Sequence, residues 1–210
     1  MLRIMQGARL APILGAILTF VPGFLPATEA GSFGGRAFSA FVTAPMLGVA
    51  PEYIGDTGAL PSEGGWQSAG LPDTEVGALL AAQTLVASTS GGVDSGQVAS
   101  TSTSLAGLVL FPGNLAETTA SFVRAQAAAT LGGISGTTEI DQLTFGGMPV
   151  QVTGLPNQRI VIPGVATLVI NEQAITTGLT SRGITVNALH LKLATGEEVV
   201  VSSATSSVSY

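Results

Sequence analysis

Apolar and polar residues alternate along most of the chain with the period of two that is typical of β-strands. The first such run is Arg36–Leu47, in which we expect Phe38, Ala40 and Val42 to share one face. Longer runs follow at Leu80–Ser90, Gln97–Phe111 and Thr118–Leu131. The first of these three has an alternative, because GlyAlaLeuLeuAlaAla at 77–82 contains good helix formers and Asp73 or Thr74 would cap a short helix there.

The two longest runs have different inner surfaces. Residues 100–104 read SerThrSerThrSer, and such small and β-branched residues favour a strand over a helix. In the neighbouring run the residues that share a face are small and apolar: Val123, Ala125, Ala127 and Ala129. We therefore expect a second sheet to approach this face closely.

The second half of the chain repeats the pattern with shorter strands. They are predicted at Glu139–Phe145, Met148–Val152, Arg159–Ile162, Ala166–Glu172, Gly183–Leu193 and Glu197–Ser203. Turns rich in Gly, Pro and Asn separate them. In the last hairpin the leucines at 189, 191 and 193 should point inward, while His190 and Lys192 point outward. These spacings predict an all-β fold, an antiparallel sandwich or a flattened barrel with long strands.

The first thirty residues have the layout of a secretory signal peptide. Arg3 and Arg9 precede an apolar run at residues 10–25, and small residues lead up to Ala30. We expect cleavage after Ala30, with Ala27 as a second choice, since the run is shorter than the roughly twenty residues of a membrane-spanning helix. The alternative is an uncleaved N-terminal anchor. The exported part is then a single β-rich domain, residues 31–210, and its first segment, residues 31–75, reads as mostly loop.

Composition narrows the range of partners. The chain has no cysteine, so it forms no disulfide, and its net charge is −6 from 7 basic and 13 acidic residues. The cations are few and scattered, so we predict neither nucleic acid nor an anionic membrane as a partner, because both require a basic patch. Only 10% of the residues are charged, which suits a protein embedded in a wall or matrix. After signal cleavage we expect no membrane or covalent anchor.

Catalytic chemistry has few candidates. A serine nucleophile needs a base, and the single histidine, His190, lies on the polar side of a predicted strand, which favours a solvated or structural role. A glycoside hydrolase would need two paired carboxylates. The candidates are spread over separate loops and strands: Asp56, Glu63, Asp73, Glu75, Asp141 and Glu172. Glu172 ends a buried-looking strand, where we expect its side chain to bond backbone groups at a turn. We predict no catalytic residue and no enzymatic activity.

Ligand and metal sites are equally sparse. Asp56 and Asp94 each lie in a Gly-rich segment that fits an ordinary turn, so calcium remains a minor possibility, while zinc lacks ligands. We therefore predict no cofactor. Trp66, the only tryptophan, lies in the Gly-rich stretch GluGlyGlyTrpGlnSer, where a sugar-stacking ring would be exposed. The alternative is that Trp66 covers the open end of a small-residue core.

Several of these segments together resemble the choice-of-anchor P family of exported, β-rich bacterial surface proteins. The matching segments are GlyArgAlaPheSerAla at 35–40, LeuValAlaSerThrSer at 85–90, the Ser/Thr-rich run from Gln97, residues 119–129, ValIleAsnGluGln at 169–173 and residues 184–191. The resemblance implies export and association with the cell surface. It implies no activity and no catalytic residue.

Export and low charge favour a secreted structural or surface protein that assembles with itself or with other envelope proteins into a layer, filament or matrix. A carbohydrate-binding or adhesive module, with a polysaccharide partner at Trp66, is the alternative. A glycoside hydrolase has the least support in the sequence.

Overall fold

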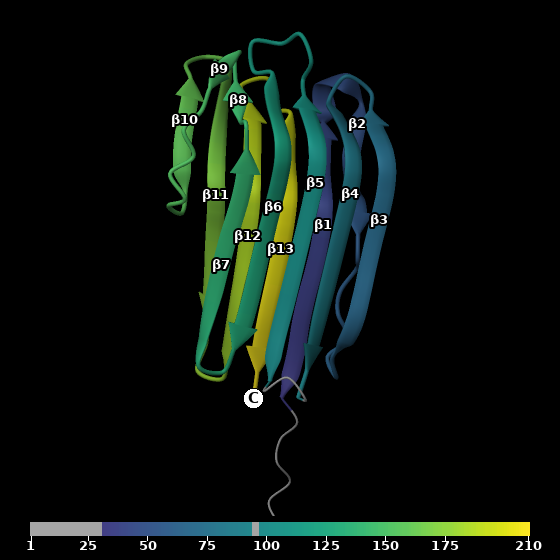
Figure 1. Ribbon diagram of the computed structural model, residues 1–210, viewed down its shortest axis with the longest axis vertical. Coiled ribbons are helices and arrows are strands. Elements are labelled where there is room, and N and C mark those ends of the chain that lie inside the picture. Colours follow the sequence, from purple (N-terminus) through teal and green to yellow (C-terminus); the bar gives the residue numbers. More distant parts are fainter. Residues whose placement is uncertain (1–30, 94–96) are drawn as a thin grey trace, which may run out of the picture.

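The computed structural model describes residues 31–93 and 97–210, and two antiparallel sheets pack face to face within them (Figure 1). Sheet A has the order β10 (Gln158–Ile162), β11 (Ala166–Thr177), β12 (Ser181–Leu193), β13 (Glu198–Ser209), β1 (Ser32–Ala44) and β2 (Val49–Asp56). Sheet B has the order β3 (Gly65–Val76), β4 (Leu80–Gly92), β5 (Val98–Leu110), β6 (Thr118–Thr130), β8 (Thr144–Phe145) and β9 (Met148–Pro149), and β7 (Gly133–Asp141) also pairs with β6. This confirms the predicted all-β sandwich, and the described sheets do not close into a barrel.

The two ends of the sandwich are named from Figure 1, in which the strands run vertically. The end with β8 and β9 is the upper end, and the end with the C-terminus is the lower end. The predicted signal peptide, residues 1–30, and Asp94 lie outside the described residues. No helix within the described ranges has the length and apolar character needed to cross a membrane.

The prediction that residues 31–75 are mostly loop is wrong. This segment contains the strands β1, β2 and β3, with the 3₁₀ turn η1 (Pro45–Leu47) between the first two. Its glycines and Pro72 suggested turns, but an edge strand such as β3 tolerates both, because one side of its backbone needs no partner. The alternative helix at 77–82 is also absent, since Leu80 begins β4.

The two sheets approach each other closely because small side chains face one another between them. Ala125, Ala127 and Ala129 of β6 are buried, as predicted. Ser206 of β13 crosses the interface and donates to the backbone oxygen of Ala127 at 3.0 Å. Thr101 of β5 likewise donates to the backbone oxygen of Thr205 at 2.8 Å, and such bonds lower the cost of burying a hydroxyl. Ser39 Oγ is buried without a hydrogen-bond partner among the described residues.

Each sheet is crossed by a row of residues at which the strands exchange their inner and outer faces. In sheet A this reversal row is Gly55, Ser39, Ser202, Ala188 and Asn171, at which neighbouring strands skip one pairing and then resume the same register. The backbone has positive φ at Gly55, Ser202 and Asn171, on alternate strands. Because only one pairing is skipped, the hydrogen-bonded ladder keeps its register on both sides of the row. The side chain that follows the row, however, moves to the other face of the sheet.

Sheet B has an equivalent row at Gln83, Gly107, Ser121 and Gln142. Positive φ occurs here at Gly107 and Gln142, again on alternate strands. The row separates β7 from β8, which continue one another along β6. Each sheet therefore contains one row of residues at which its strands exchange their inner and outer faces.

The reversal row corrects one predicted face. Ala40 and Val42 are buried above the row, but below it the buried residues of β1 are Phe33, Gly35 and Ala37. Phe38 therefore lies on the outer face of sheet A, not with Ala40 and Val42. Strict alternation fails at this point because Ser39 and Ala40 both face inward.

Candidate functional site

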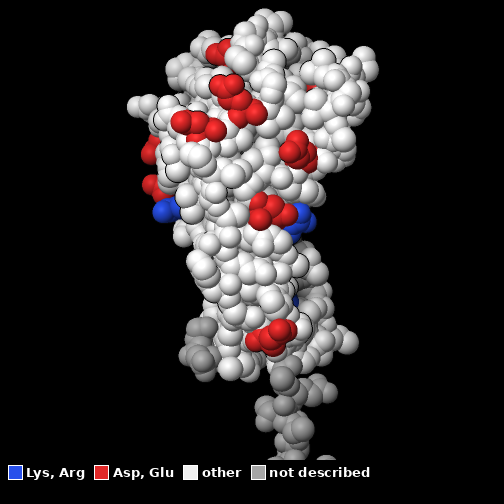
Figure 2. All heavy atoms as spheres, turned by 90° about the vertical axis from the view of Figure 1, so that its right-hand side faces the viewer, with Lys and Arg blue, Asp and Glu red and all other residues white. Residues whose placement is uncertain are grey.

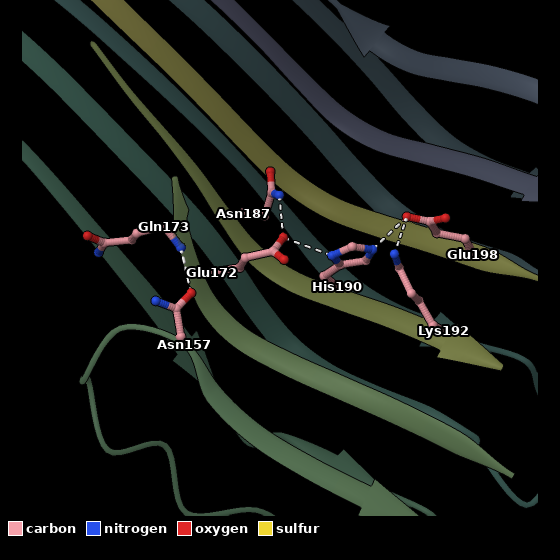
Figure 3. A network of polar contacts seen from close by, with 7 residues as sticks. All are labelled: Asn157, Glu172, Gln173, Asn187, His190, Lys192 and Glu198. Carbon is pink, nitrogen blue, oxygen red and sulfur yellow. Dashed lines mark hydrogen bonds and ion pairs between the residues drawn. The ribbon is translucent and has the colours of Figure 1, made fainter. Parts of the chain in front are cut away.

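Titratable and aromatic side chains gather on the outer face of sheet A, around its reversal row. At its centre the ring of His190 on β12 lies between two carboxylates (Figure 3). Its Nδ1 is 2.8 Å from Oε2 of Glu172 on β11, and its Nε2 is 2.7 Å from Oε1 of Glu198 on β13. Asn187 donates to the same Glu172 oxygen at 2.7 Å, and Lys192 Nζ is 3.3 Å from Glu198. We call these five residues the His190 cluster.

The reversal row brings this cluster together. On an ordinary strand two outward residues are two positions apart, but Ala188 and Leu189 both face inward, so Asn187 and His190 are successive outward residues. Glu172 pairs directly with Asn187, just across the row from His190. The prediction that Glu172 ends a strand and bonds a turn is therefore wrong, because β11 continues to Thr177 and the carboxylate binds side chains of β12.

The protonation of the cluster follows from these contacts. Burial of the His190 ring opposes its charging, but the bonds to Glu172 and Glu198 outweigh burial and raise the pKa of His190 above its usual range. The bond from His190 lowers the pKa of Glu172 more than burial raises it. Burial raises the pKa of Glu198, but His190 and Lys192 more than offset this, so that its pKa is also lowered. Below this raised pKa the ring is a charged imidazolium between two carboxylates.

Further polar and charged side chains lie next to the His190 cluster. A hollow of about 250 Å³ beside the cluster is lined by Arg159 and Thr167 in addition to cluster residues. Among the described residues no group of three His, Asp, Glu or Cys side chains is arranged to hold a metal ion. Both nitrogens of His190 already face carboxylates, so neither is directed at an open position. The arrangement suits a structural ion-pair network or recognition of a polar ligand.

An aromatic cluster lies on the same face, on β1 and β2. The rings of Phe38 and Phe41 contact Tyr53 at centroid distances of 5.0 and 4.9 Å. The Arg36 guanidinium lies 4.2 Å from the Tyr53 ring centroid and binds Asp56 through two hydrogen bonds. Those bonds lower the pKa of the Asp56 carboxyl. Asp56 therefore binds within the chain, to Arg36 and to the Gly58 backbone N–H.

The other predicted carboxylates do not form a catalytic pair. Glu63 lies beside Ser62, and Asp73, Glu75 and Asp141 are exposed on edge strands of sheet B. The two carboxylates that the structure brings closest to one histidine have lowered pKa values, whereas a glycosidase acid needs a raised one. The described geometry gives the hydrolase hypothesis no support.

Trp66 lies at the start of edge strand β3 with 68% of its surface exposed. It does not cover the core, and the His190 and aromatic clusters are on other strands. The ring is exposed, and it lies on a different strand and sheet from the hydrogen-bonding groups of the His190 cluster.

The edges of sheet B form a second functional candidate. β3 and β7 each pair with a strand on one side only, so most backbone N–H and C=O groups on the other side have no strand partner, and on β7 the Gly136 oxygen accepts from the Gln173 side chain at 3.2 Å. Both strands carry acidic residues in their upper part, at Asp73 and Glu75 on β3 and at Glu139 and Asp141 on β7. Their lower parts, Trp66–Leu71 and Gly133–Thr138, carry no charge.

The charge distribution on the β2 and β3 side is visible directly. Figure 2 shows acidic side chains gathered on the upper half of this side, while most of the lower half is uncharged. Charged residues on an edge strand discourage pairing with another strand. The lower edges lack this protection.

Comparison with known protein families, curated proteins and solved structures finds no match to this chain. Function must therefore be argued from the chain's own surfaces.

Proposed function

We propose that this chain is an exported, non-enzymatic structural protein that assembles with copies of itself into a surface layer, filament or matrix. One observation carries the proposal: the lower parts of β3 and β7 are uncharged edge segments of the same sheet, and each pairs with a strand on one side only. Such edges offer backbone groups to a strand of another copy.

The remainder of the molecule supports the same role. Only 10% of all residues are charged, so a contact between copies has few charges to remove from water. Both edge strands are long, since β3 contains 12 residues and β7 contains 9. Export, the resemblance to the choice-of-anchor P family and a location outside the cell remain predictions from the sequence.

The test compares one substitution at an edge with the same substitution at the centre of sheet B. Ser68 on β3 and Ser102 on β5 occupy the same cross-strand row, paired through Ser88 of β4. We expect Ser68→Lys to weaken assembly, measured by light scattering, because a lysine on an edge discourages pairing. Ser102→Lys should leave it unchanged. Equal effects of the two substitutions would contradict edge pairing.

Recognition of a polysaccharide is the second candidate, and the outer face of sheet A favours it. There, aromatic rings suited to stacking on sugars lie on the same face as the hydrogen-bonding groups of the His190 cluster. This moves the predicted sugar contact from Trp66 to Tyr53, which is 47% exposed. Calorimetric titration with cell-wall and matrix polysaccharides should show binding that Tyr53→Ala abolishes and Trp66→Ala does not. Binding lost with Trp66→Ala would restore the original location.

A further inference from the structure

The upper end of the sandwich contains an apolar groove. It has a volume of about 540 Å³, in the range of sites that hold drug-sized molecules, and lies where the β8–β9 hairpin faces β10. Its lining is largely apolar and includes Leu115, Phe145, Met148, Val150, Ile160 and Ile162. Leu115 and Met148 on its rim are 74% and 69% exposed, so the groove is open to a partner.

The lower end carries an apolar projection. The turn that joins β11 to β12 presents Leu179, which is 98% exposed, and Ile175 near the end of β11 is 62% exposed. Figure 1 shows this turn at the lower left of the sandwich and β8, β9 and β10 at the upper left. The projection and the groove therefore lie on the same side of the molecule and at opposite ends.

Charges beside the two features are complementary. Glu117 lies at the groove, since its backbone oxygen accepts from Gly146, which lines it. Arg182 is exposed and lies three positions after Leu179. Among the described residues, neither side chain forms an ion pair. One oxygen of the Glu117 carboxylate accepts from the Gly113 backbone N–H at 2.6 Å, which leaves the other oxygen for a partner.

We propose that the β11–β12 turn of one copy inserts Leu179 into the upper apolar groove of the next copy. Arg182 then approaches Glu117 of the receiving copy. This contact joins different surfaces of two identical chains, so it does not close on itself and each added copy presents a new groove. Because the two features lie on the same side, repeated contacts extend the assembly along the strand direction. The inference rests on the proposed self-assembly and identifies its axial contact.

The test uses cysteine pairs in a chain that has no native cysteine. Processed protein recovered from producing cells would carry Met148→Cys together with Leu179→Cys. These positions lie at opposite ends of one molecule, so any disulfide between them joins two copies. Mild oxidation should give a ladder of covalent multimers on a non-reducing gel. In the control, Leu47→Cys replaces Leu179→Cys, because Leu47 is also a well-exposed leucine but lies in η1 at the upper end.

A second measurement removes the contact without cross-linking. Leu179→Asp should raise the protein concentration needed for assembly about tenfold or more, since an apolar side chain would no longer be buried. Arg182→Glu should weaken assembly, and adding Glu117→Arg should restore it. Both sites are on the surface, and circular dichroism verifies that each variant is folded.

The outcomes separate the two proposals. Unmodified protein that stays monomeric overturns the proposed function and the inference with it. Assembly with a cysteine ladder no stronger than that of the Leu47→Cys control overturns the axial contact and leaves self-assembly standing. If Met148→Lys blocks assembly but Leu179→Asp does not, the groove receives a different segment, which also overturns the inference.

Discussion

Replacing His190 with glutamine tests whether the His190 cluster holds the outer face of sheet A together. Charged His190 binds Glu172 on β11 and Glu198 on β13, and so links strands on both sides of β12. Glutamine keeps a polar side chain of similar length but has no positive charge. We expect the variant to fold and to be less stable, by an amount that depends on pH.

The magnitude follows from burial. Hydrogen bonds to charged groups contribute about 1.5–3 kcal/mol, and fully exposed ion pairs about 0.2–1 kcal/mol. The His190 side chain is 11% exposed, but Glu172 and Glu198 are 31% and 33% exposed, so solvent screens both pairs. We expect a loss of about 1–2 kcal/mol, or about 2–8 °C in the midpoint of thermal unfolding for a domain of this size.

The sign of the pH dependence comes from the shifted groups. The raised pKa of His190 means that its stabilisation is complete below the unfolded value of 6.5 and is lost as pH rises through the folded pKa. The lowered pKa values of Glu172 and Glu198 mean that theirs is present above 4.5 and is lost as pH falls through the folded values. The contribution of the cluster is therefore greatest between those limits.

Urea unfolding of both proteins at pH 5.5 and pH 8.5 provides the assay. At pH 5.5 the wild type should be more stable than His190→Gln by the amount given above, and at pH 8.5 the difference should shrink. A neutral imidazole carries one N–H, so one carboxylate loses its donor. Lys192 and Arg159 also face this region, and both remain in the two proteins compared. A difference equal at both pH values would refute the reasoning.

Two further substitutions test the reversal rows and the core. Gly107→Ala should destabilise the protein by about 1–2 kcal/mol, because φ is +63° there and the new Cβ would lie 2.6 Å from Cδ of Gln83. Gly70→Ala is the control, because φ is ordinary there and the new Cβ would meet only the Leu85 backbone oxygen, at an ordinary contact distance of 3.6 Å. Equal effects in chemical unfolding would argue against the row. Leu105→Ala should cost about 2–5 kcal/mol, because Leu105 is almost fully buried between the sheets. A loss below about 1 kcal/mol in the same assay would show that the core is loosely packed there.

Much of the fold could be predicted from local pattern alone. Alternation located β4, β5, β6 and β12 to within a few residues, because both sheets have one inward and one outward face. The predicted last strand is too short, since β13 continues beyond Ser203 to Ser209. The small inner face of β6 predicted the close approach of the second sheet, which Ser206 makes through its bond to Ala127. Leu189 and Leu191 face inward as predicted.

The candidate site could not be predicted, because it depends on the reversal row. Phe38 and Phe41, and likewise Asn187 and His190, are outward at a spacing of three, which strict alternation assigns to opposite faces. Glycine within a strand pattern is a recognised sign of such an irregularity, and Gly107 carried that sign. Nothing in the residue types Ser39 and Ala188 distinguishes them from ordinary strand positions.

The central claim, that this chain assembles with itself, is tested most directly by sedimentation velocity of the unmodified processed protein over a wide range of concentrations. The proposed function predicts species that grow with concentration, and electron microscopy of the largest should show extended assemblies. A single monomeric species at every concentration would contradict the claim.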